Sequence, residues 1–351
     1  MKIRIITIHG IPNFGSVFQS YGLCKYLIDC GYEDTKVIDY NPPYYEKQGL
    51  KHMLGKFLFF KDHIIRKKKF RGFIESNVPL TKKSFTSYED LSAYDFDADV
   101  YIAGGDQIWN VFHASGNDIS YRLTFTNGKK ISYGTSMGQK DFPADELKKL
   151  ADDIRDFSSV SVREKSSVEH LYHEGVNATH VVDPVYLLER KEYEKFLKPV
   201  QDADYLFVYL VTPSQLLEDT IKYLKEKYNL KVILCSGFMP KCTCDKFIRN
   251  AGPEEILSYI KNARIVLSAS FHATAFSIMF EKQFYTILPH KSTNERIESL
   301  LEIRNLSQRI VNTHTKFDEA FDREIDYSQV ADYSKLIEES KSYLQKALEN
   351  D

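Results

Sequence analysis

Short apolar segments alternate with loops of small residues and with stretches of helical spacing, and this order constrains the fold more than any other feature of the chain. The first apolar segment has isoleucine at positions 3, 5, 6 and 8, and the turn-rich loop 9–16 follows it. Apolar residues recur at helical spacing over 17–28, and a second apolar segment covers 36–40. Near-continuous apolar strands are typical of parallel sheets, so this order predicts a strand–helix–strand unit with a right-handed crossover.

The same alternation continues through the rest of the chain. We expect further strands at 99–103, 130–133, 159–162, 180–182, 205–211, 231–234, 264–269 and 284–288. We expect helices at 144–155, 163–174, 215–228, 253–262, 274–280, 293–303 and 328–349. Strands and helices that alternate in this way predict an α/β chain of two Rossmann-like, doubly wound domains that face each other across a cleft.

The length of 351 residues suits two domains, because a domain has roughly 150 residues. We place the boundary near 185–200, where Asp183 and Lys198 each precede a proline. The N-terminal Rossmann-like domain is expected at 1–190, with a basic insertion at about 44–75. The C-terminal Rossmann-like domain is expected at 191–327, and the helix at 328–351 is expected to pack back on the N-terminal domain.

Composition excludes several classes of protein. There are 47 Lys and Arg and 49 Asp and Glu, and the net charge of −2 argues against a surface that binds nucleic acid throughout. No window of 18 apolar residues occurs and the N-terminus lacks the pattern of a signal peptide, so we expect a cytoplasmic protein. Five irregularly spaced cysteines predict no disulfide framework. Cys235, Cys242 and Cys244 lack a fourth ligand nearby, so we expect no metal site.

The segment 47–71 differs from the rest of the chain in its charge. It holds nine Lys or Arg and one acid, Asp62, for a net charge of +8, which leaves −2 − 8 = −10 for the remainder. Apolar residues lie between the charges, so the segment reads as a basic amphipathic helix or helix pair. It either contacts an anionic membrane, where a lipid-linked acceptor would be found, or forms a solvated insertion at one end of the first domain.

Two strand ends in the first half suit binding of an anion. Asn13, Gly15 and Ser16 open a helix and can present backbone N–H groups to an anion, although any strand-to-helix turn needs small residues. Arg163 follows another strand, and its guanidinium matches a carboxylate or a phosphate. The alternative for Arg163 is a structural ion pair with Glu164 or another neighbour.

A third strand end suits contact with a sugar. Gly104 and Gly105 allow a ligand to approach the backbone closely. Asp106 is expected to begin a helix, where it either caps that helix or acts on a substrate hydroxyl. Trp109 is the single tryptophan, and its ring either stacks on a sugar or packs in the core.

The fourth strand end carries a histidine. Small hydroxylated residues up to Ser270 precede His272 at an expected helix N-terminus, which places a proton carrier beside backbone donors. A capping or core role is the alternative, and His9, at the end of the first strand, is a weaker candidate. The chain has no phosphate-binding lysine loop and no GxGxxG or HExxH motif. These absences argue against NTP hydrolysis, nicotinamide redox chemistry and zinc proteolysis.

Six stretches, taken together and in this order, resemble the polysaccharide pyruvyl transferase family. They are N-F-G-S-V-F-Q-S-Y-G-L (13–23), G-G-D-Q-I-W-N (104–110), S-V-R-E (161–164), V-D-P-V (182–185), G-P-E-E (252–255) and S-F-H-A-T-A-F-S-I (270–278). The resemblance implies a fold similar to GT-B glycosyltransferases. It also implies transfer of a pyruvyl group from phosphoenolpyruvate onto two hydroxyls of a sugar in a cell-surface polysaccharide precursor, which forms a pyruvate ketal and needs no metal or organic cofactor.

The resemblance also implies roles for individual residues. Arg163, His272 and the backbone of Phe271 correspond to residues that contact the donor, and Thr274 lies in the same stretch. Well-studied members have Arg where this chain has Ser270, so one donor cation is either missing or supplied from elsewhere. Some members also have Asp at the position of Ser16.

We expect His272 and Asp106 to serve as the general acid and base. The expected partners are phosphoenolpyruvate and a glycan, lipid-linked at the inner face of the membrane, with no nucleic acid. Two alternatives stay open. One is a nucleotide-sugar-dependent glycosyltransferase of the same fold, with its nucleotide near 252–255. The other is a non-catalytic carbohydrate-binding relative.

Overall fold

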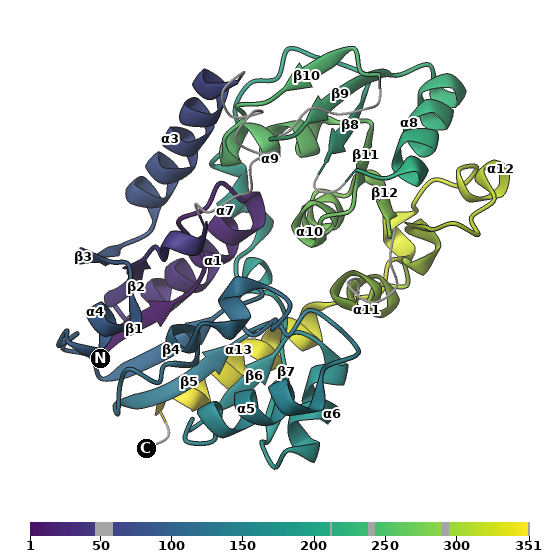
Figure 1. The fold of residues 1–351 in the computed structure, drawn as a ribbon. Coiled ribbons are helices and arrows are strands. Elements are labelled where there is room, and N and C mark those ends of the chain that lie inside the picture. The colour runs from purple at the N-terminus through teal and green to yellow at the C-terminus, as the bar shows by residue number, and fades with distance from the viewer. Residues whose placement is uncertain (46–58, 211–212, 238–242, 289–294, 350–351) are drawn as a thin grey trace. The chain divides into compact units, whose positions relative to one another are not determined.

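The structure is a computed structural model that describes residues 1–45, 59–210, 213–237, 243–288 and 295–349. The chain forms two compact units (Figure 1). Unit 1 comprises Met1–Gly49, Phe70–Leu188 and Tyr333–Asp351, and unit 2 comprises Leu50–Lys69 and Glu189–Asp332. The basic insertion, which we expected within the first domain, is therefore divided, and its part Leu50–Lys69 belongs to unit 2. Residues 46–58 of that insertion lie outside the described residues.

Unit 1 is built on a parallel sheet. Its strands are β1 (Lys2–Ile6), β2 (Asp34–Tyr40), β3 (Leu80–Phe85), β4 (Val100–Gly104) and β5 (Lys129–Tyr133), in the order β3-β2-β1-β4-β5. The apolar residues of β1 make the centre of the sheet, where Ile5 pairs with Val37 on one side and Ile102 on the other. A parallel pair, β6 (Val160–Val162) and β7 (Ala178–His180), continues the sheet beyond β5 through isolated bridges.

Helices cover this sheet. They are α1 (Phe14–Asp29), α4 (Tyr88–Ser92), α5 (Ala144–Ile154), α6 (Lys165–His173) and α13 (Ser334–Glu349), with short 3-10 turns η1 (Pro43–Tyr45), η2 (Ala114–Asn117), η3 (Ile119–Arg122) and η4 (Pro184–Tyr186). The last helix lies against the sheet of unit 1 (Figure 1). The Tyr343 hydroxyl donates to the Ser132 carbonyl at 3.0 Å, and the Val182 N–H donates to Ser340 Oγ at 2.9 Å.

Unit 2 repeats the architecture. Its strands are β8 (Tyr205–Tyr209), β9 (Lys231–Cys235), β10 (Lys246–Ile248), β11 (Ile265–Ser268), β12 (Gln283–Ile287) and β13 (Ile310–Val311), all parallel, in the order β10-β9-β8-β11-β12-β13. Its helices are α7 (Arg190–Glu194), α8 (Gln215–Tyr228), α9 (Pro253–Asn262), α10 (Phe271–Met279), α11 (Glu295–Ile303) and α12 (Phe317–Ala320), with the 3-10 turns η6 (Ser307–Arg309) and η7 (Tyr327–Gln329). The predicted α/β architecture of two Rossmann-like sheets is therefore confirmed.

The helix α3 (Phe60–Asn77) begins in unit 2 and ends in unit 1. Within unit 2, Asp62 Oδ1 accepts a hydrogen bond of 2.8 Å from the Asn250 side chain, and the Lys69 ammonium pairs with Glu255. Within unit 1, the ring of Phe73 lies 5.0 Å from that of Phe18. Within the described ranges, no helix is both long and apolar enough to cross a bilayer.

Each sheet has one point where the strand order reverses. The strand β1 lies between β2 and β4, and β8 lies between β9 and β11. The chain runs outward from the first strand on one side and then returns to start again on the other. In open α/β sheets, ligands bind at the carboxyl ends of the strands at this reversal. The loops after β1, β4, β8 and β11 are therefore where function is expected.

Candidate functional site

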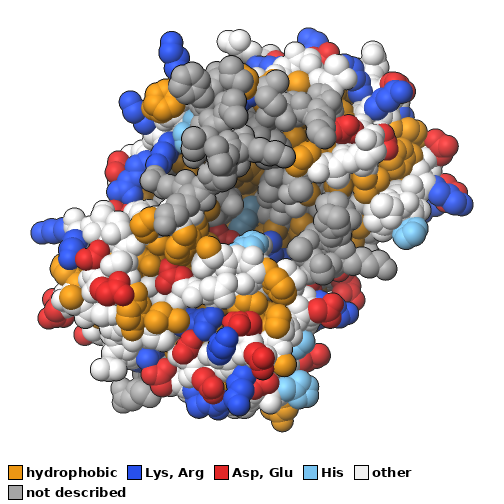
Figure 2. All heavy atoms as spheres, viewed as in Figure 1, with side chains coloured by type: hydrophobic (Ala, Val, Ile, Leu, Met, Phe, Trp, Pro, Cys, Tyr) orange, Lys and Arg blue, Asp and Glu red, His pale blue; other side chains and the backbone are white. Residues whose placement is uncertain are grey.

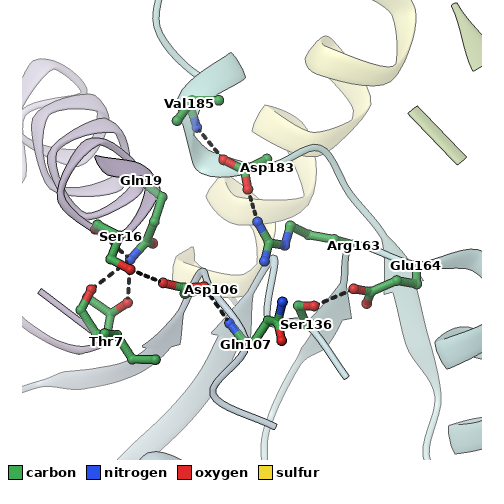
Figure 3. A network of polar contacts seen from close by, with 12 residues as sticks. Thr7, Ser16, Gln19, Asp106, Gln107, Ser136, Arg163, Glu164, Asp183 and Val185 are labelled. Atoms are coloured by element: carbon green, nitrogen blue, oxygen red, sulfur yellow. Dashed lines mark hydrogen bonds and ion pairs between the residues drawn. The ribbon is translucent and has the colours of Figure 1, made fainter. Parts of the chain in front are cut away.

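The reversal in unit 1 brings together Ser16 and Asp106, which lie 90 positions apart in the sequence. Ser16 opens α1 after β1, and Asp106 follows β4. The Ser16 hydroxyl donates a hydrogen bond to Asp106 Oδ2, and the Gln107 N–H donates to Oδ1 at 2.8 Å (Figure 3). The carboxylate of Asp106 is thus held in a fixed orientation at the carboxyl edge of the sheet.

The backbone around Asp106 is unusual. Gly105 and Asp106 have φ of +63° and +50°, in the left-handed region, and residues 106–109 form a turn rather than the predicted helix. A Cβ at position 105 would clash with the Gln19 side chain, which itself donates to Thr7 Oγ1 at 2.7 Å. Position 105 therefore requires glycine, both for its positive φ and for the close approach of the Gln19 side chain. The sequence alone did not indicate this role of Gln19.

The loop after β1 does not offer its N–H groups as predicted. Asn13 caps α1, and its Oδ1 accepts hydrogen bonds from Gly15 N at 2.9 Å and Ser16 N at 3.4 Å. These donors are occupied by the cap, so the expected role in binding an anion is corrected to a structural one for Asn13 and Gly15. Gly104 has a packing role as well, because a Cβ there would meet Ile5 at 3.1 Å.

Arg163 is buried and forms an ion pair with Asp183 (Figure 3). Its backbone is fixed on both sides: its N–H donates to the Thr135 carbonyl at 3.1 Å, and its carbonyl accepts from His180 Nε2 at 3.1 Å. Burial lowers the pKa of His180, which keeps the imidazole neutral. The structural alternative for Arg163 therefore holds, with Asp183 as the partner in place of Glu164.

Glu164 is also buried, but it takes different partners. It accepts hydrogen bonds from the Ser136 hydroxyl and from Met137 N at 3.4 Å. With Asp106 and Asp183 it is one of three buried carboxylates in the loops that follow β4, β6 and β7.

Trp109 does not present its ring to a ligand. The side chain is 0% exposed, its ring centroid lies 6.1 Å from that of Phe157, and Nε1 donates to the Tyr121 carbonyl at 3.2 Å. The predicted sugar contact is therefore corrected to core packing. On the same connection, Phe112 is the exposed aromatic residue, at 53%.

Tyrosine hydroxyls gather close to this reversal, at the end of β2. Tyr40 and Tyr44 both donate to Asp118 Oδ2, at 2.7 and 2.9 Å. The Tyr45 hydroxyl lies 3.0 Å from that of Tyr121. Burial raises the pKa of Tyr45, and the charge of Asp106 contributes to this rise. A half-buried aromatic pair, Tyr44 and Tyr45, with ring centroids 4.7 Å apart, thus lies on the Asp106 side of unit 1.

The weaker histidine candidate, His9, has a structural role, because its buried ring contacts other groups of the protein. Its ring is buried, with Nδ1 at 3.1 Å from the Thr7 carbonyl and Nε2 at 3.0 Å from Asp39 Oδ1. Both ring nitrogens are therefore taken up by contacts within the protein. Arg71 adds a bidentate contact to the same carboxylate, at 2.9 and 3.1 Å.

The reversal in unit 2 carries the other candidate histidine. The Ser268 hydroxyl bridges from β11 to the Tyr209 carbonyl of β8 at 2.8 Å, and Ser270 N donates to Ser268 Oγ at 3.0 Å. Ser270 then caps α10 by accepting from Ala273 N at 3.4 Å. The helix begins at Phe271, three residues earlier than predicted, so His272 lies in its first turn and is 5% exposed.

Two residues at the start of α10 or beside it have clear contacts. Thr274 is buried, with Oγ1 at 2.8 Å from Thr286 Oγ1 and donating to the Ser270 carbonyl at 3.1 Å, so its expected ligand role is corrected to a structural one. The guanidinium carbon of Arg296, on α11, lies 5.8 Å from the ring centroid of Phe271. Arg296 therefore brings a positive charge to the end of α10, which has the cap Ser270 where the family resemblance led us to expect a cation.

The stretch 252–255 begins α9. Gly252 N donates to Glu255 Oε2 at 2.5 Å, and Glu255 also pairs with Lys69. A Cβ at position 252 would lie 2.8 Å from the Cβ of Lys69. The glycine and the acid at this strand end thus serve to cap α9 and to hold α3 against it.

Comparison with solved structures shows which known proteins have a similar fold. A UDP-GlcNAc 2-epimerase from Methanocaldococcus jannaschii is 14% identical with a TM-score of 0.59, covering 98% of this chain and 99% of that chain. A UDP-GlcNAc 2-epimerase from Neisseria meningitidis is 11% identical with a TM-score of 0.53, covering 99% and 94%. At these identities the likeness shows the fold, which is of the GT-B kind.

Comparison with the curated proteins by sequence gave no match. The family model described as "Polysaccharide pyruvyl transferase" matches residues 13–291. This match covers most of the chain and includes the loops that carry Asp106, Arg163 and His272. The chain therefore belongs to the polysaccharide pyruvyl transferase family.

Proposed function

We propose that this protein transfers the pyruvyl group of phosphoenolpyruvate onto two hydroxyls of a sugar in a cell-surface polysaccharide precursor and forms a pyruvate ketal. One observation carries the proposal: the family match spans both sheet reversals, where Asp106 and His272 are held in the loops that follow β4 and β11. The substrates follow from what each reversal can bind.

The donor is assigned to the α10 end of unit 2. Phosphoenolpyruvate carries several negative charges, and the helix N-terminus favours an anion. Arg296 supplies a full positive charge beside Phe271, and His272 supplies an imidazole, the side chain that most often acts as a general acid or base. In this assignment Arg163 acts through its pair with Asp183, as a positioning residue, because that carboxylate balances its charge.

The acceptor hydroxyls are assigned to Asp106. Its carboxylate is held by Ser16 and Gln107 and can accept a hydrogen bond, and then a proton, from a sugar hydroxyl. The rings of Tyr44 and Tyr45 and the exposed ring of Phe112 give sugar-sized apolar surfaces on the connections that follow β2 and β4. Phe112 replaces Trp109 as the candidate for stacking on the sugar.

The proposed chemistry balances without a metal or an organic cofactor. His272 protonates the methylene carbon of phosphoenolpyruvate, which creates an oxocarbenium-like centre at C2. One sugar hydroxyl adds to C2 and loses its proton to Asp106. The C2–O bond to phosphate then breaks, and the second hydroxyl closes the ketal. The two sugar hydroxyls release two protons. One restores the proton that His272 gave to the methylene carbon, and the other leaves with inorganic phosphate.

Phosphate release is the test of this reaction. The full chain is incubated with phosphoenolpyruvate and a panel of lipid-linked and nucleotide-linked glycans, and phosphate and ketal are measured together. We expect acceptor-dependent release of one phosphate per ketal, lost in Asp106→Asn. If a correctly folded protein releases no phosphate with any acceptor of the panel, the assignment is contradicted.

Two alternatives remain as competing proposals. A solved epimerase structure of similar fold is described in complex with UDP-GlcNAc and UDP, which favours a nucleotide-sugar-dependent glycosyltransferase as the second candidate. The predicted nucleotide position at 252–255 is partly occupied by Lys69, which weighs against it. A non-catalytic carbohydrate-binding protein would keep glycan binding in His272→Ala and show no turnover.

We also propose where the reaction takes place. Polysaccharide precursors carried on lipids present their sugars close to a bilayer, so we assign the enzyme to the cytoplasm, at the inner face of the membrane. The acceptor would then be a lipid-linked glycan, and phosphoenolpyruvate would reach the site from solution.

A further inference from the structure

We propose that the exposed face of the first half of α3 is a membrane-docking surface for anionic lipid. The surface consists of Phe60, Lys61, Ile65, Lys67 and Lys68, all of which are exposed. We name it the α3 docking face. It is independent of the ketal chemistry, so the reaction and the docking can succeed or fail separately.

Helical spacing puts these five residues on one side of α3. At about 3.6 residues per turn they fall within a little less than half of the circumference. The other side of the same half-helix is occupied within unit 2, where Asp62 contacts Asn250 and Lys69 pairs with Glu255. The helix is therefore anchored by one side and presents the other to its surroundings.

The α3 docking face combines exposed apolar groups with positive charge. Phe60 is 60% exposed and Ile65 is 40% exposed, and these are two of the few large apolar side chains that the described part of the chain leaves exposed. Lys61 and Lys68 form no ion pair with any residue that the structure describes. Lys and Arg side chains gather over α3 in Figure 2.

The local charge contrasts with that of the whole protein. The three lysines of the α3 docking face carry a charge of +3, whereas the chain as a whole has −2. An anionic bilayer attracts such a positive patch and disfavours approach by acidic parts of the surface. The charge distribution thus selects both the partner and the orientation of α3 toward it.

Apolar side chains on the α3 docking face favour lipid over a soluble polyanion. Burying the exposed areas of Phe60 and Ile65 is favourable only if the partner offers an apolar phase, as the headgroup–acyl boundary does. A polyanion in water would use the lysines and leave both apolar groups exposed. Each lysine near an anionic surface contributes about fivefold to binding, so three contribute on the order of 100-fold.

Vesicle co-sedimentation tests the proposal. The full chain is mixed with phosphatidylcholine vesicles with or without phosphatidylglycerol, at low and at physiological salt. We expect binding only to the anionic vesicles, weakened by salt. The triple variant Lys61→Gln, Lys67→Gln, Lys68→Gln should bind on the order of 100-fold more weakly, and Phe60→Ser, Ile65→Ser should also lose most of the binding.

Matched controls come from other exposed residues. Lys148→Gln, Lys149→Gln, Lys335→Gln removes the same charge, and Tyr172→Ser removes an aromatic ring that is 67% exposed. Both should bind as the unaltered chain does, and every variant should release phosphate normally with a soluble acceptor. The proposal is overturned if the unaltered chain ignores anionic vesicles or if the lysine variant binds them as well as the controls do. A second outcome would also overturn the proposal. If the variant Phe60→Ser, Ile65→Ser keeps full vesicle binding, and the lysine variant loses binding both to vesicles and to soluble polyphosphate, the surface binds polyanions in general and not a lipid bilayer.

Discussion

At the scale of single residues, the role of a charged side chain depends on ion-pair and hydrogen-bond partners that are distant in the sequence and cannot be identified from it. Arg163 follows a strand end, as a ligand-binding residue would, yet its partner Asp183 lies 20 positions further on and beyond β7. His272 gains its place from Ser270, which caps α10, and from the early start of that helix. Arg296, which comes from another helix, brings a positive charge beside Phe271 at the start of α10.

Replacement of His272 by Asn should lower kcat for phosphate release by about 100- to 10,000-fold, because proton transfer by a positioned group contributes that much. The KM for phosphoenolpyruvate should change little, since an amide still fits the first turn of α10 and the helix N-terminus is retained. Steady-state phosphate release measures both constants. The exposed His314 on unit 2 provides the control His314→Asn, and an unchanged kcat in His272→Asn would exclude the histidine from the chemistry.

Replacement of Arg296 by Gln should act on binding instead. Loss of a charge-assisted contact to a donor anion costs about 1.5–3 kcal/mol, which raises the KM for phosphoenolpyruvate by roughly 10- to 100-fold. The kcat at saturation should fall much less. Arg323→Gln, at an exposed position in the same unit, controls for the loss of charge. Equal KM values in the two variants would remove Arg296 from the donor site.

At the scale of elements, apolar segments predicted most strands, and the misses have physical causes. The edge strand β3 reads LTKKSF and is largely exposed, so it lacks the apolar run that marks a buried strand. The short strands β10 and β13 gain their stability from their neighbours. The turn at Asp106 was predicted as a helix because the positive φ of two consecutive residues is invisible in the sequence.

One polar network joins several elements of unit 1. Asp39 on β2 accepts hydrogen bonds from His9 after β1, from Arg71 on α3 and from Ser84 on β3. Burial by itself raises the pKa of Asp39, but these hydrogen bonds together outweigh it and hold the pKa well below its usual range. The carboxylate therefore fixes the C-terminal half of α3 on the sheet.

Replacement of Asp39 by Asn should destabilise unit 1 by about 3–5 kcal/mol near pH 7, because the Arg71 guanidinium and the buried His9 ring lose the carboxylate that both contact. The lowered pKa means that the contribution of Asp39 is present above its unfolded pKa of about 4 and disappears as the pH falls toward the lower folded value. The difference between the two proteins should therefore shrink below about pH 4.

Urea unfolding followed over that pH range measures this difference. The exposed Asp141 gives the control Asp141→Asn, which should unfold like the unaltered chain. A variant at position 39 that is as stable as the control near neutral pH would show that the network does not hold unit 1 together.

At the scale of the whole molecule, the order of segments alone was enough to predict two Rossmann-like sheets, and the fold comparisons agree. The candidate site was predictable only as a set of strand ends, since the reversals at β1/β4 and β8/β11 depend on which strands pair. That pairing explains why Ser16 meets Asp106, and why the bridge from Ser268 to Tyr209 leads to His272. In our proposal, Asp106 at the first reversal takes the acceptor, and Arg296 beside the second reversal takes the donor.

This separation predicts which small molecule stabilises the protein. A ligand that binds only the folded state raises the free energy of unfolding by about 2.7 kcal/mol at 100 times its Kd, enough to shift a thermal transition by several degrees. Phosphoenolpyruvate should raise the transition that reports unit 2, and UDP should not. Arg296→Gln should abolish the shift, whereas Arg323→Gln should keep it. A shift with UDP but not with phosphoenolpyruvate would favour the glycosyltransferase instead. A nucleoside diphosphate would then be the anion that binds at Arg296 and the N-terminus of α10.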